Sequence, residues 1–190
     1  MLDTVLVMGT GSWGTAAAGL VSENARRVVM WARSPEVAQS INEQHTNPRH
    51  LRDYVLPATL TATSDAAAAV RGADAIVIAV PSNHLRNVLG GFVGLVDPDV
   101  PMLVLTKGIE PGSHLLMTEV VSDVLGNPGR VAALSGPNHA EEVCQGRVSA
   151  AVVGSAHAGV SSLFQDLFLR RHFRIIQRSE ERRVGKECRS

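Results

Sequence analysis

Three glycines near the N-terminus, Gly9, Gly11 and Gly14, have the spacing G-x-G-x-x-G. This pattern is typical of turns that bind the pyrophosphate of a dinucleotide. The first glycine allows a tight turn, the second lets the backbone approach the phosphates, and the third lets the next helix pack close to a strand. The N–H groups at the start of that helix favour a negative charge. We therefore predict a pyrophosphate site, with a glycine-rich turn of another α/β protein as the alternative.

Arg33 bears on which dinucleotide is bound. It lies 19 positions after Gly14, where folds that prefer NAD often have an acidic residue. A carboxylate there accepts a hydrogen bond from the ribose 2′-hydroxyl group, whereas an arginine can bind a 2′-phosphate with two parallel hydrogen bonds. Arg33 thus favours NADP. The alternative is a solvated arginine at the end of a strand.

Two later segments carry further polar groups. Lys107 follows the apolar residues 102–105 and can direct its ammonium group at an oxyanion or a carbonyl oxygen, although it can equally be solvated. Gly136 and Asn138 precede a helix that we expect from about residue 139. The backbone N–H groups there, together with the Asn138 amide, predict an anion site.

Two other residue types that often do chemistry are interpreted as structural. His139 can act as a general acid, but a neutral, hydrogen-bonded histidine at the start of a helix is the favoured interpretation. Cys144 is expected to pack against its neighbours. Cys144 and Cys188 give neither a disulfide framework nor a zinc-ligand spacing, so we expect no metal site.

The rest of the chain alternates between strand and helix. Strands are predicted at residues 5–8, 28–31, 59–63, 75–80, 102–105, 131–134, 148–153 and 173–176. Helices are predicted at residues 15–22, 35–44, 65–71, 84–95, 115–125 and 160–169, with Ser34 and Ser64 as N-caps of the second and third. The polar residues 45–57 predict a loop long enough to bind a ligand. The fold class is therefore α/β, with a doubly wound, mainly parallel, Rossmann-type sheet.

Ligands of such open sheets bind outside the carboxyl ends of the strands. The segments expected to meet there are residues 9–14, Arg33, and residues 80–81, 106–108 and 135–140.

Composition excludes several classes of protein. The 190 residues include 18 basic and 18 acidic side chains, so no nucleic-acid-binding footprint is visible. The longest apolar runs have the length of a strand, far below the roughly 20 residues that cross a membrane. The N-terminus has no basic region before its apolar run, so we expect it not to be a signal peptide. We expect a cytoplasmic protein.

Residues 178–190 differ in character, with five basic and three acidic groups. This stretch resembles the translation of a common sequencing adapter, and a solvated tail is the alternative. We favour a non-native tail at 178–190, which leaves residues 1–177 as a truncated dinucleotide-binding domain.

Four segments together carry a family resemblance. Residues 9–15, 80–81, 106–110 and 134–143 resemble, in order and spacing, the NAD(P)-dependent glycerol-3-phosphate dehydrogenases. The similarity covers about residues 3–177. The last two segments are the specific ones, because many dehydrogenases share the glycine motif.

The resemblance implies roles for individual residues. The dinucleotide would contact the three glycines of the motif and Ser12, Trp13, Arg33, His50, Lys107 and Ala140. The substrate, glycerol 3-phosphate or dihydroxyacetone phosphate, would contact Lys107, Gly136 and Asn138. The segment after His50 departs from the family's usual Leu-Pro continuation, and Asn138 stands where bacterial relatives often have Ser or Thr.

The family's reaction is reversible hydride transfer between the cofactor and dihydroxyacetone phosphate, which gives sn-glycerol 3-phosphate for glycerophospholipid synthesis. Family members take the proton-transfer lysine from an Ala-Leu-Lys-Asn motif in an all-helical second domain. This sequence contains neither, so we expect no catalytic residue in it and no activity of this chain alone.

Other interpretations stay open. One is another dehydrogenase of the superfamily, of the 2-hydroxyacid or ketopantoate reductase type; another is a nucleotide-binding module without chemistry. The expected partner is a small-molecule substrate, with no nucleic acid and no membrane span. A homodimer is an option for the full-length protein.

Overall fold

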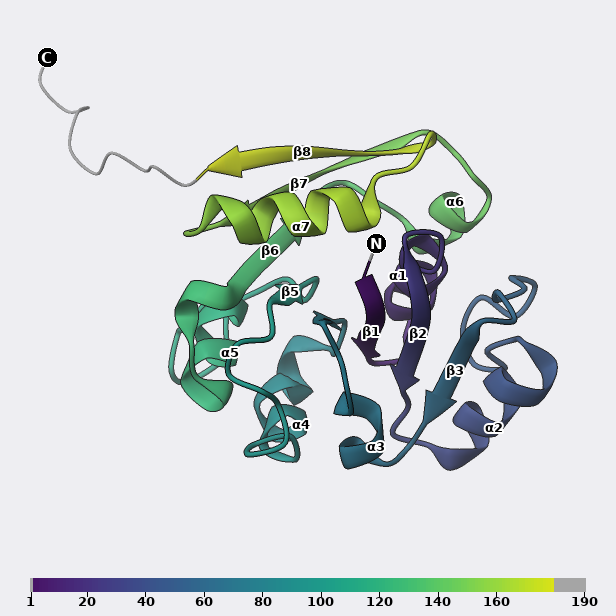
Figure 1. The fold of residues 1–190 in the computed structure, drawn as a ribbon, viewed down its shortest axis with the longest axis horizontal. Coiled ribbons are helices and arrows are strands. Elements are labelled where there is room, and N and C mark those ends of the chain that lie inside the picture. Colours follow the sequence, from purple (N-terminus) through teal and green to yellow (C-terminus); the bar gives the residue numbers. More distant parts are fainter. Residues whose placement is uncertain (1, 180–190) are drawn as a thin grey trace, which may run out of the picture.

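A single sheet supports the fold. The structure, a computed structural model, describes residues 2–179. Its strands lie in the order β3-β2-β1-β4-β5-β6-β7-β8 (Figure 1). Their bounds are β1 Leu2–Met8, β2 Ala25–Trp31, β3 Leu60–Thr63, β4 Ala75–Ile78, β5 Met102–Val104, β6 Val131–Ser135, β7 Ser149–Ser155 and β8 Phe173–Ser179.

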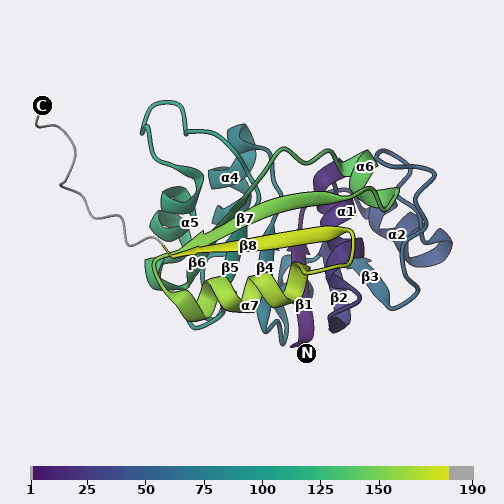
Figure 2. The same cartoon turned by 90° about the horizontal axis from the view of Figure 1, so that it is seen from above.

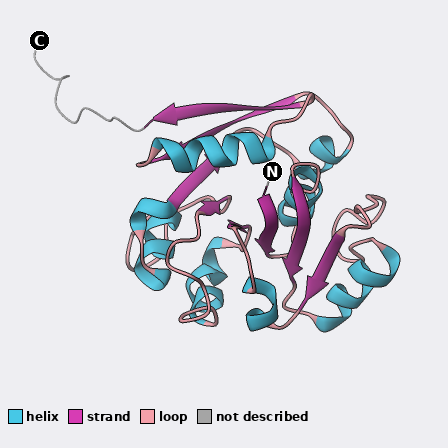
Figure 3. Cartoon of the chain, in the orientation of Figure 1, coloured by secondary structure: helices cyan, strands magenta, loops and turns pink. Residues whose placement is uncertain are grey.

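Each connection between consecutive strands of the described chain contains an α-helix (Figure 3). Their bounds are α1 Ser12–Val21, α2 Pro35–Gln44, α3 Ala66–Val70, α4 Leu85–Gly90, α5 Met117–Leu125, α6 Ala140–Cys144 and α7 Ala158–Phe168. Two short 3₁₀ turns, η1 Ser82–His84 and η2 Pro128–Arg130, complete the set for the described residues. None of the described helices has the length and apolar character needed to cross a membrane.

Residues of β1 point alternately to the two faces of the sheet, and both faces are buried. Val5 and Val7 belong to a core that includes side chains of α1 and α7. Leu6 and Met8 belong to a second core that includes side chains of α4 and α5. All four side chains are completely buried. A strand buried on both sides has no polar positions, which is why the sequence shows a continuous apolar run here.

The predicted mainly parallel sheet is confirmed. β1 pairs in parallel with β2 and with β4, as in the matches Val5↔Val28 and Val5↔Ala75. The β6–β7 pair is antiparallel, with Leu134 opposite Val153. β7 and β8 are parallel to each other, and α7 runs beside them (Figure 2).

Several predicted boundaries were wrong. α1 begins at Ser12 rather than at residue 15, because Gly11 takes the extended N-cap conformation and the helix starts immediately after it. The N-cap of α3 is Asp65 rather than Ser64, since the Asp65 carboxylate accepts from the N–H groups of Ala67 and Ala68. The helix predicted to end at residue 95 ends at Gly90, before a run of turns.

The predicted tail overlaps the last strand. β8 continues to Ser179, so Arg178 and Ser179 pair with Gly154 and Ser155 of β7. Residues 180–190, which include Cys188, lie outside the described residues. The domain boundary at residue 177 therefore stays a prediction.

Candidate functional site

The glycine turn between β1 and α1 is shaped by close backbone contacts. Gly9 has a φ of +107°, a conformation that L side chains rarely adopt, and a Cβ there would lie 2.6 Å from the carbonyl oxygen of Ala79. A Cβ on Gly14 would overlap the carbonyl oxygen of Gly9. Nothing lies within 4 Å of the corresponding position at Gly11. Gly11 thus leaves open space beside the first N–H groups of α1.

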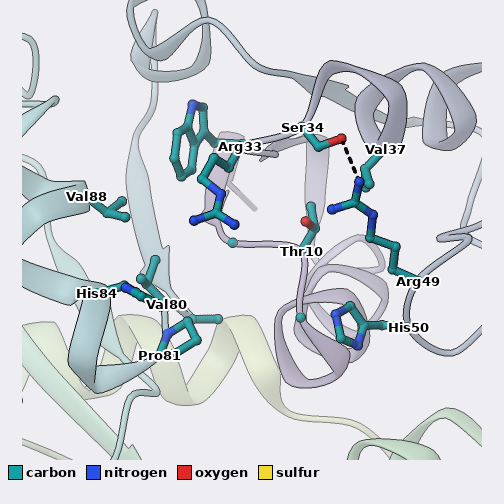
Figure 4. A pocket seen from close by; sticks show the side chains of 14 residues that line it. Thr10, Arg33, Ser34, Val37, Arg49, His50, Val80, Pro81, His84 and Val88 are labelled. Carbon is teal, nitrogen blue, oxygen red and sulfur yellow. Dashed lines mark hydrogen bonds between the residues drawn. The ribbon is translucent and has the colours of Figure 1, made fainter.

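A pocket of about 210 Å³ lies over this turn (Figure 4). Its walls come from segments that follow the carboxyl ends of β1, β2 and β4, as the fold class predicts. Among the predicted residues it gathers Gly9, Gly11, Arg33, His50, Val80 and Pro81. Residues that the sequence reasoning missed also line it, namely Ser34, Arg49 and His84.

The loop after α2 reaches the pocket because one buried side chain ties it down. Asn47 is completely buried, and its Nδ2 donates to the carbonyl oxygen of Thr10 at 2.7 Å and to Thr15 Oγ1 at 2.8 Å. Its Oδ1 accepts from the backbone N–H groups of Arg49 and His50. Asn47 therefore joins the loop to both ends of the glycine turn. Its residue type within a polar loop gave no signal of this role.

His50 and Ser12 lie together at the start of α1. His50 Nδ1 is 3.4 Å from Ser12 Oγ, and the imidazole lines the pocket. Trp13 points elsewhere: its indole packs on the ring of Phe173, with centroids 6.2 Å apart, at the edge of the core. Trp13 therefore presents its backbone N–H group, not its ring, at the start of α1.

A second cluster joins the end of β5 to the end of β6. Lys107 Nζ donates to the carbonyl oxygen of Gly136 at 2.8 Å. A Cβ on Gly136 would lie 2.5 Å from Asn138 Nδ2 and 2.8 Å from the carbonyl oxygen of Ala150. Asn138 Oδ1 is buried and has no hydrogen-bond partner within the described part of the chain. The structure thus brings the three predicted substrate contacts together.

A hydroxyl group connects this cluster to the pocket. Thr106, next to Lys107, donates from Oγ1 to the carbonyl oxygen of Val80 at 2.6 Å, and Val80 lines the pocket. The two groups of residues therefore belong to one edge of the sheet.

The loop that carries Lys107 is also held by an ion pair. Glu110 binds Arg86 of α4 through two hydrogen bonds of 2.9 Å, and Ser113 Oγ donates to the same carboxylate. These bonds, the one from Arg86 first, lower the pKa of Glu110 to about 2. Arg86 also pairs with Asp123 of α5. The sequence reasoning missed Arg86, because its partner lies 24 residues away.

The remaining predicted residues lie around α6. Ala140 is buried at the first position of the helix, and α6 packs on α1. His139 is the N-cap residue, and its side chain makes no capping hydrogen bond. Cys144 is half-buried, and burial, aided by the charge of Glu141, raises the pKa of its thiol to about 11. Such a thiol carries little thiolate at neutral pH, consistent with packing.

Comparison with known proteins gives the family. The family model described as "NAD-dependent glycerol-3-phosphate dehydrogenase N-terminus" matches residues 4–160. A glycerol-3-phosphate dehydrogenase [NAD(P)+] of Corynebacterium jeikeium is 43% identical over 171 residues, which cover 90% of this chain and 52% of that relative. One from Streptomyces griseus is 44% identical over 160 residues, covering 84% and 48%.

Solved structures agree with this relationship. A glycerol-3-phosphate dehydrogenase from Coxiella burnetii superposes with a TM-score of 0.85 at 30% identity, covering 93% of this chain and 54% of that one. One from Plasmodium falciparum gives the same TM-score at 28% identity, covering 93% and 52%. The chain spans about half the length of the relatives it matches. It belongs to the NAD-dependent glycerol-3-phosphate dehydrogenase family, whose N-terminal part it matches.

Proposed function

We propose that this chain binds NADP or NAD and that the full-length protein reduces dihydroxyacetone phosphate to sn-glycerol 3-phosphate. The observation that carries the proposal is the position of two features at one edge of the sheet: the pocket over the glycine turn, and the Lys107–Gly136–Asn138 cluster beside it. Membership of the family supports the same conclusion. The reaction's product is a precursor of glycerophospholipids.

The residues at the glycine turn fit a dinucleotide. The open space at Gly11 admits a pyrophosphate next to the N–H groups of α1, whose dipole favours negative charge. Arg33 would bind the adenosine ribose or its 2′-phosphate. His50 and Ser12, which lie together at the start of α1, would contact the dinucleotide next to its phosphates. Ala140 and Trp13 would contribute through backbone groups. When bound, the reduced nicotinamide supplies the hydride.

The second cluster fits the substrate. An ammonium group has three N–H donors, and the Gly136 carbonyl oxygen takes one from Lys107, so two are left for an anionic or carbonyl oxygen. The unpartnered Asn138 Oδ1 can accept from a substrate hydroxyl group, which removes the cost of a buried polar atom without a partner. As negative charge grows on the carbonyl oxygen, a fixed cation nearby stabilises it.

The proton donor is proposed to lie in the Ala-Leu-Lys-Asn motif of the family, which this sequence does not contain. Lys107 is the single lysine among residues 2–179. In this proposal its ammonium group binds the substrate and does not serve as the proton donor. The chain would then bind the cofactor without turning over the substrate.

The test uses the full-length protein with NADPH and two ketones, dihydroxyacetone phosphate and hydroxyacetone. We expect rapid oxidation of NADPH with the phosphate ester and little with the ketone that lacks it. Lys107→Met should abolish the reaction, whereas Arg52→Gln, a change on an exposed turn away from the pocket, should not. Equal turnover of both ketones would overturn the assignment of dihydroxyacetone phosphate as the substrate. NADPH binding without any turnover would favour a nucleotide-binding module.

A further inference from the structure

Two arginines, not one, line the pocket. Arg33 follows β2, and Arg49 comes from the loop after α2. In Figure 4 their guanidinium groups lie on either side of Thr10 and face the same space. The backbone of Arg49 is fixed there, because Asn47 accepts from its N–H group at 3.0 Å and bonds to Thr10. The position of Arg49 is therefore a property of the fold, although its side chain is exposed.

The Arg49 side chain is part of a chain of hydrogen bonds. Its Nη2 donates to Ser34 Oγ at 3.3 Å (Figure 4). Ser34 Oγ donates in turn to the carboxylate of Glu36. The Ser34 hydroxyl, the backbone N–H of Glu36 and, more weakly, the charge of Arg49 lower the pKa of Glu36. Glu36 lies in the first turn of α2, within electrostatic reach of Arg49.

This arrangement gives Arg49 a weak partner that a stronger anion can replace. A single shared hydroxyl holds the guanidinium, whereas a phosphate group offers two or three oxygens that match its planar fork. Glu36 supplies one negative charge at a distance, and a phosphate monoester supplies nearly two at contact. The hydroxyl of Ser34 can turn from Glu36 to the phosphate, because a hydroxyl hydrogen rotates freely.

We propose that Arg49 is a second specificity-determining residue, which binds the 2′-phosphate of NADP together with Arg33, and that Ser34 and Glu36 hold Arg49 in place when no phosphate is bound. The inference rests on the proposed function, because it assumes that the dinucleotide's adenosine end lies at Arg33. It goes further in assigning phosphate recognition to the loop after α2. NAD, which lacks the 2′-phosphate, leaves the Arg49–Ser34–Glu36 arrangement undisturbed.

The arrangement has a consequence for Glu36. The Glu36 carboxylate interacts with Arg49 and, through Ser34, shares its hydrogen-bond chain, so it competes with a phosphate for that arginine and also repels the phosphate. Glu36 thus lowers the affinity for NADP without contacting NAD. Removing its charge should strengthen NADPH binding, which is the opposite of what a purely supporting residue would do.

The test measures the dissociation constants of NADPH and NADH for the full-length protein by fluorescence titration. Arg49→Gln should weaken NADPH binding about tenfold and leave NADH within about twofold. Arg49→Lys keeps the charge and loses the planar fork, so its dissociation constant for NADPH should lie between those of Arg49→Gln and the unchanged protein. Glu36→Gln should strengthen NADPH binding. Arg52→Gln, three residues along the same loop and outside the pocket lining, is the matched control and should change neither.

The outcomes distinguish the role of Arg49 from the existence of the dinucleotide site. Saturable binding of both cofactors, with Arg49→Gln changing both equally or neither, would overturn the role of Arg49 and leave the proposed function intact. A folded chain that binds neither cofactor would overturn the dinucleotide site itself and the inference with it. Circular dichroism of each variant confirms that the fold is unchanged.

Discussion

The side-chain amide of Asn47 donates to the carbonyl oxygen of Thr10 at 2.7 Å, and this bond joins the loop after α2 to the glycine turn. The two residues are 37 positions apart in the sequence. Through the same side chain, the N–H groups of Arg49 and His50 are fixed beside the pocket. One buried amide therefore joins the glycine turn to Arg49, the residue that we propose distinguishes between cofactors, and to His50.

Asn47→Ala should destabilise the fold and loosen the loop. The change leaves Thr15 Oγ1 and the Thr10 carbonyl oxygen without the donor and creates a small cavity, at a cost of about 2–3 kcal/mol in the free energy of unfolding. Urea denaturation measures this. Asn87→Ala, at an exposed helical position, should change the free energy by less than about 0.5 kcal/mol. Equal effects of the two changes would show that the Asn47 bonds contribute nothing specific.

Gly14→Ala should be strongly unfavourable although Gly14 is helical. The new Cβ would overlap the carbonyl oxygen of Gly9 and lie 3.2 Å from the Cβ of Ala79, so the turn must shift, at about 1–3 kcal/mol. Gly159→Ala in α7 is the matched control, since nothing lies within 4 Å of its Cβ position, and it should stabilise the chain by about 0.5–1 kcal/mol. Thermal unfolding compares the two. A drop in Tm for Gly159→Ala as large as that for Gly14→Ala would contradict the account.

The ion pair of Glu110 with Arg86 should make stability depend on pH in acid. The pKa of Glu110 is about 2 in the folded chain, below its ordinary value of 4.5, so the unfolded chain takes up this proton first. The stabilisation is present above about pH 4.5 and is lost as the pH falls towards 2. Glu110→Gln should therefore lower the Tm most at neutral pH, and the difference should shrink in acid. Asp53→Asn, on an exposed turn, is the control. A constant difference at all pH values would rule out this linkage.

Arg33→Asp should affect the two cofactors differently. Loss of the pairing with a 2′-phosphate, about 1.5–3 kcal/mol for a charge-assisted hydrogen bond, and the new repulsion weaken NADPH binding. The introduced carboxylate can accept from the 2′-hydroxyl group of NADH, which offsets the loss there. Fluorescence titration of both cofactors checks this. A uniform loss for both would mean that Arg33 is only a solvated side chain.

Much of this architecture could be predicted from local sequence. The apolar runs of β1 and β4 identify buried parallel strands, since every side chain in them meets a helix-covered face. The tight turn at Gly9 and Gly14 could be predicted from the glycine spacing, because such a turn imposes its residue types at fixed positions. The binding roles of this turn and of Arg33 stay predictions. The N-cap of α3 was missed because Ser64 and Asp65 are both good caps, and only the backbone geometry decides between them.

The loop and its contacts could not be predicted in this way. Asn47 and Arg49 lie in a loop without periodicity, and their bonds to Thr10 and Ser34 join residues that are distant in the sequence. Arg86 likewise reveals its role only when α4 is placed against the loop of Glu110. In each case a polar residue has a hydrogen-bond partner that only folding brings near.

We propose that this chain holds the dinucleotide site and the substrate-binding groups, and that the proton donor lies in the part of the full-length protein that this sequence does not contain. This proposal is tested most directly by comparing the rate of dihydroxyacetone phosphate reduction by the 190-residue chain with that by the full-length protein, each saturated with NADPH. Without the general acid and the second half of the active site, the rate of the chain should be lower by at least about 100-fold. A rate near that of the full-length protein would contradict the account, because it would place the complete catalytic centre within this chain.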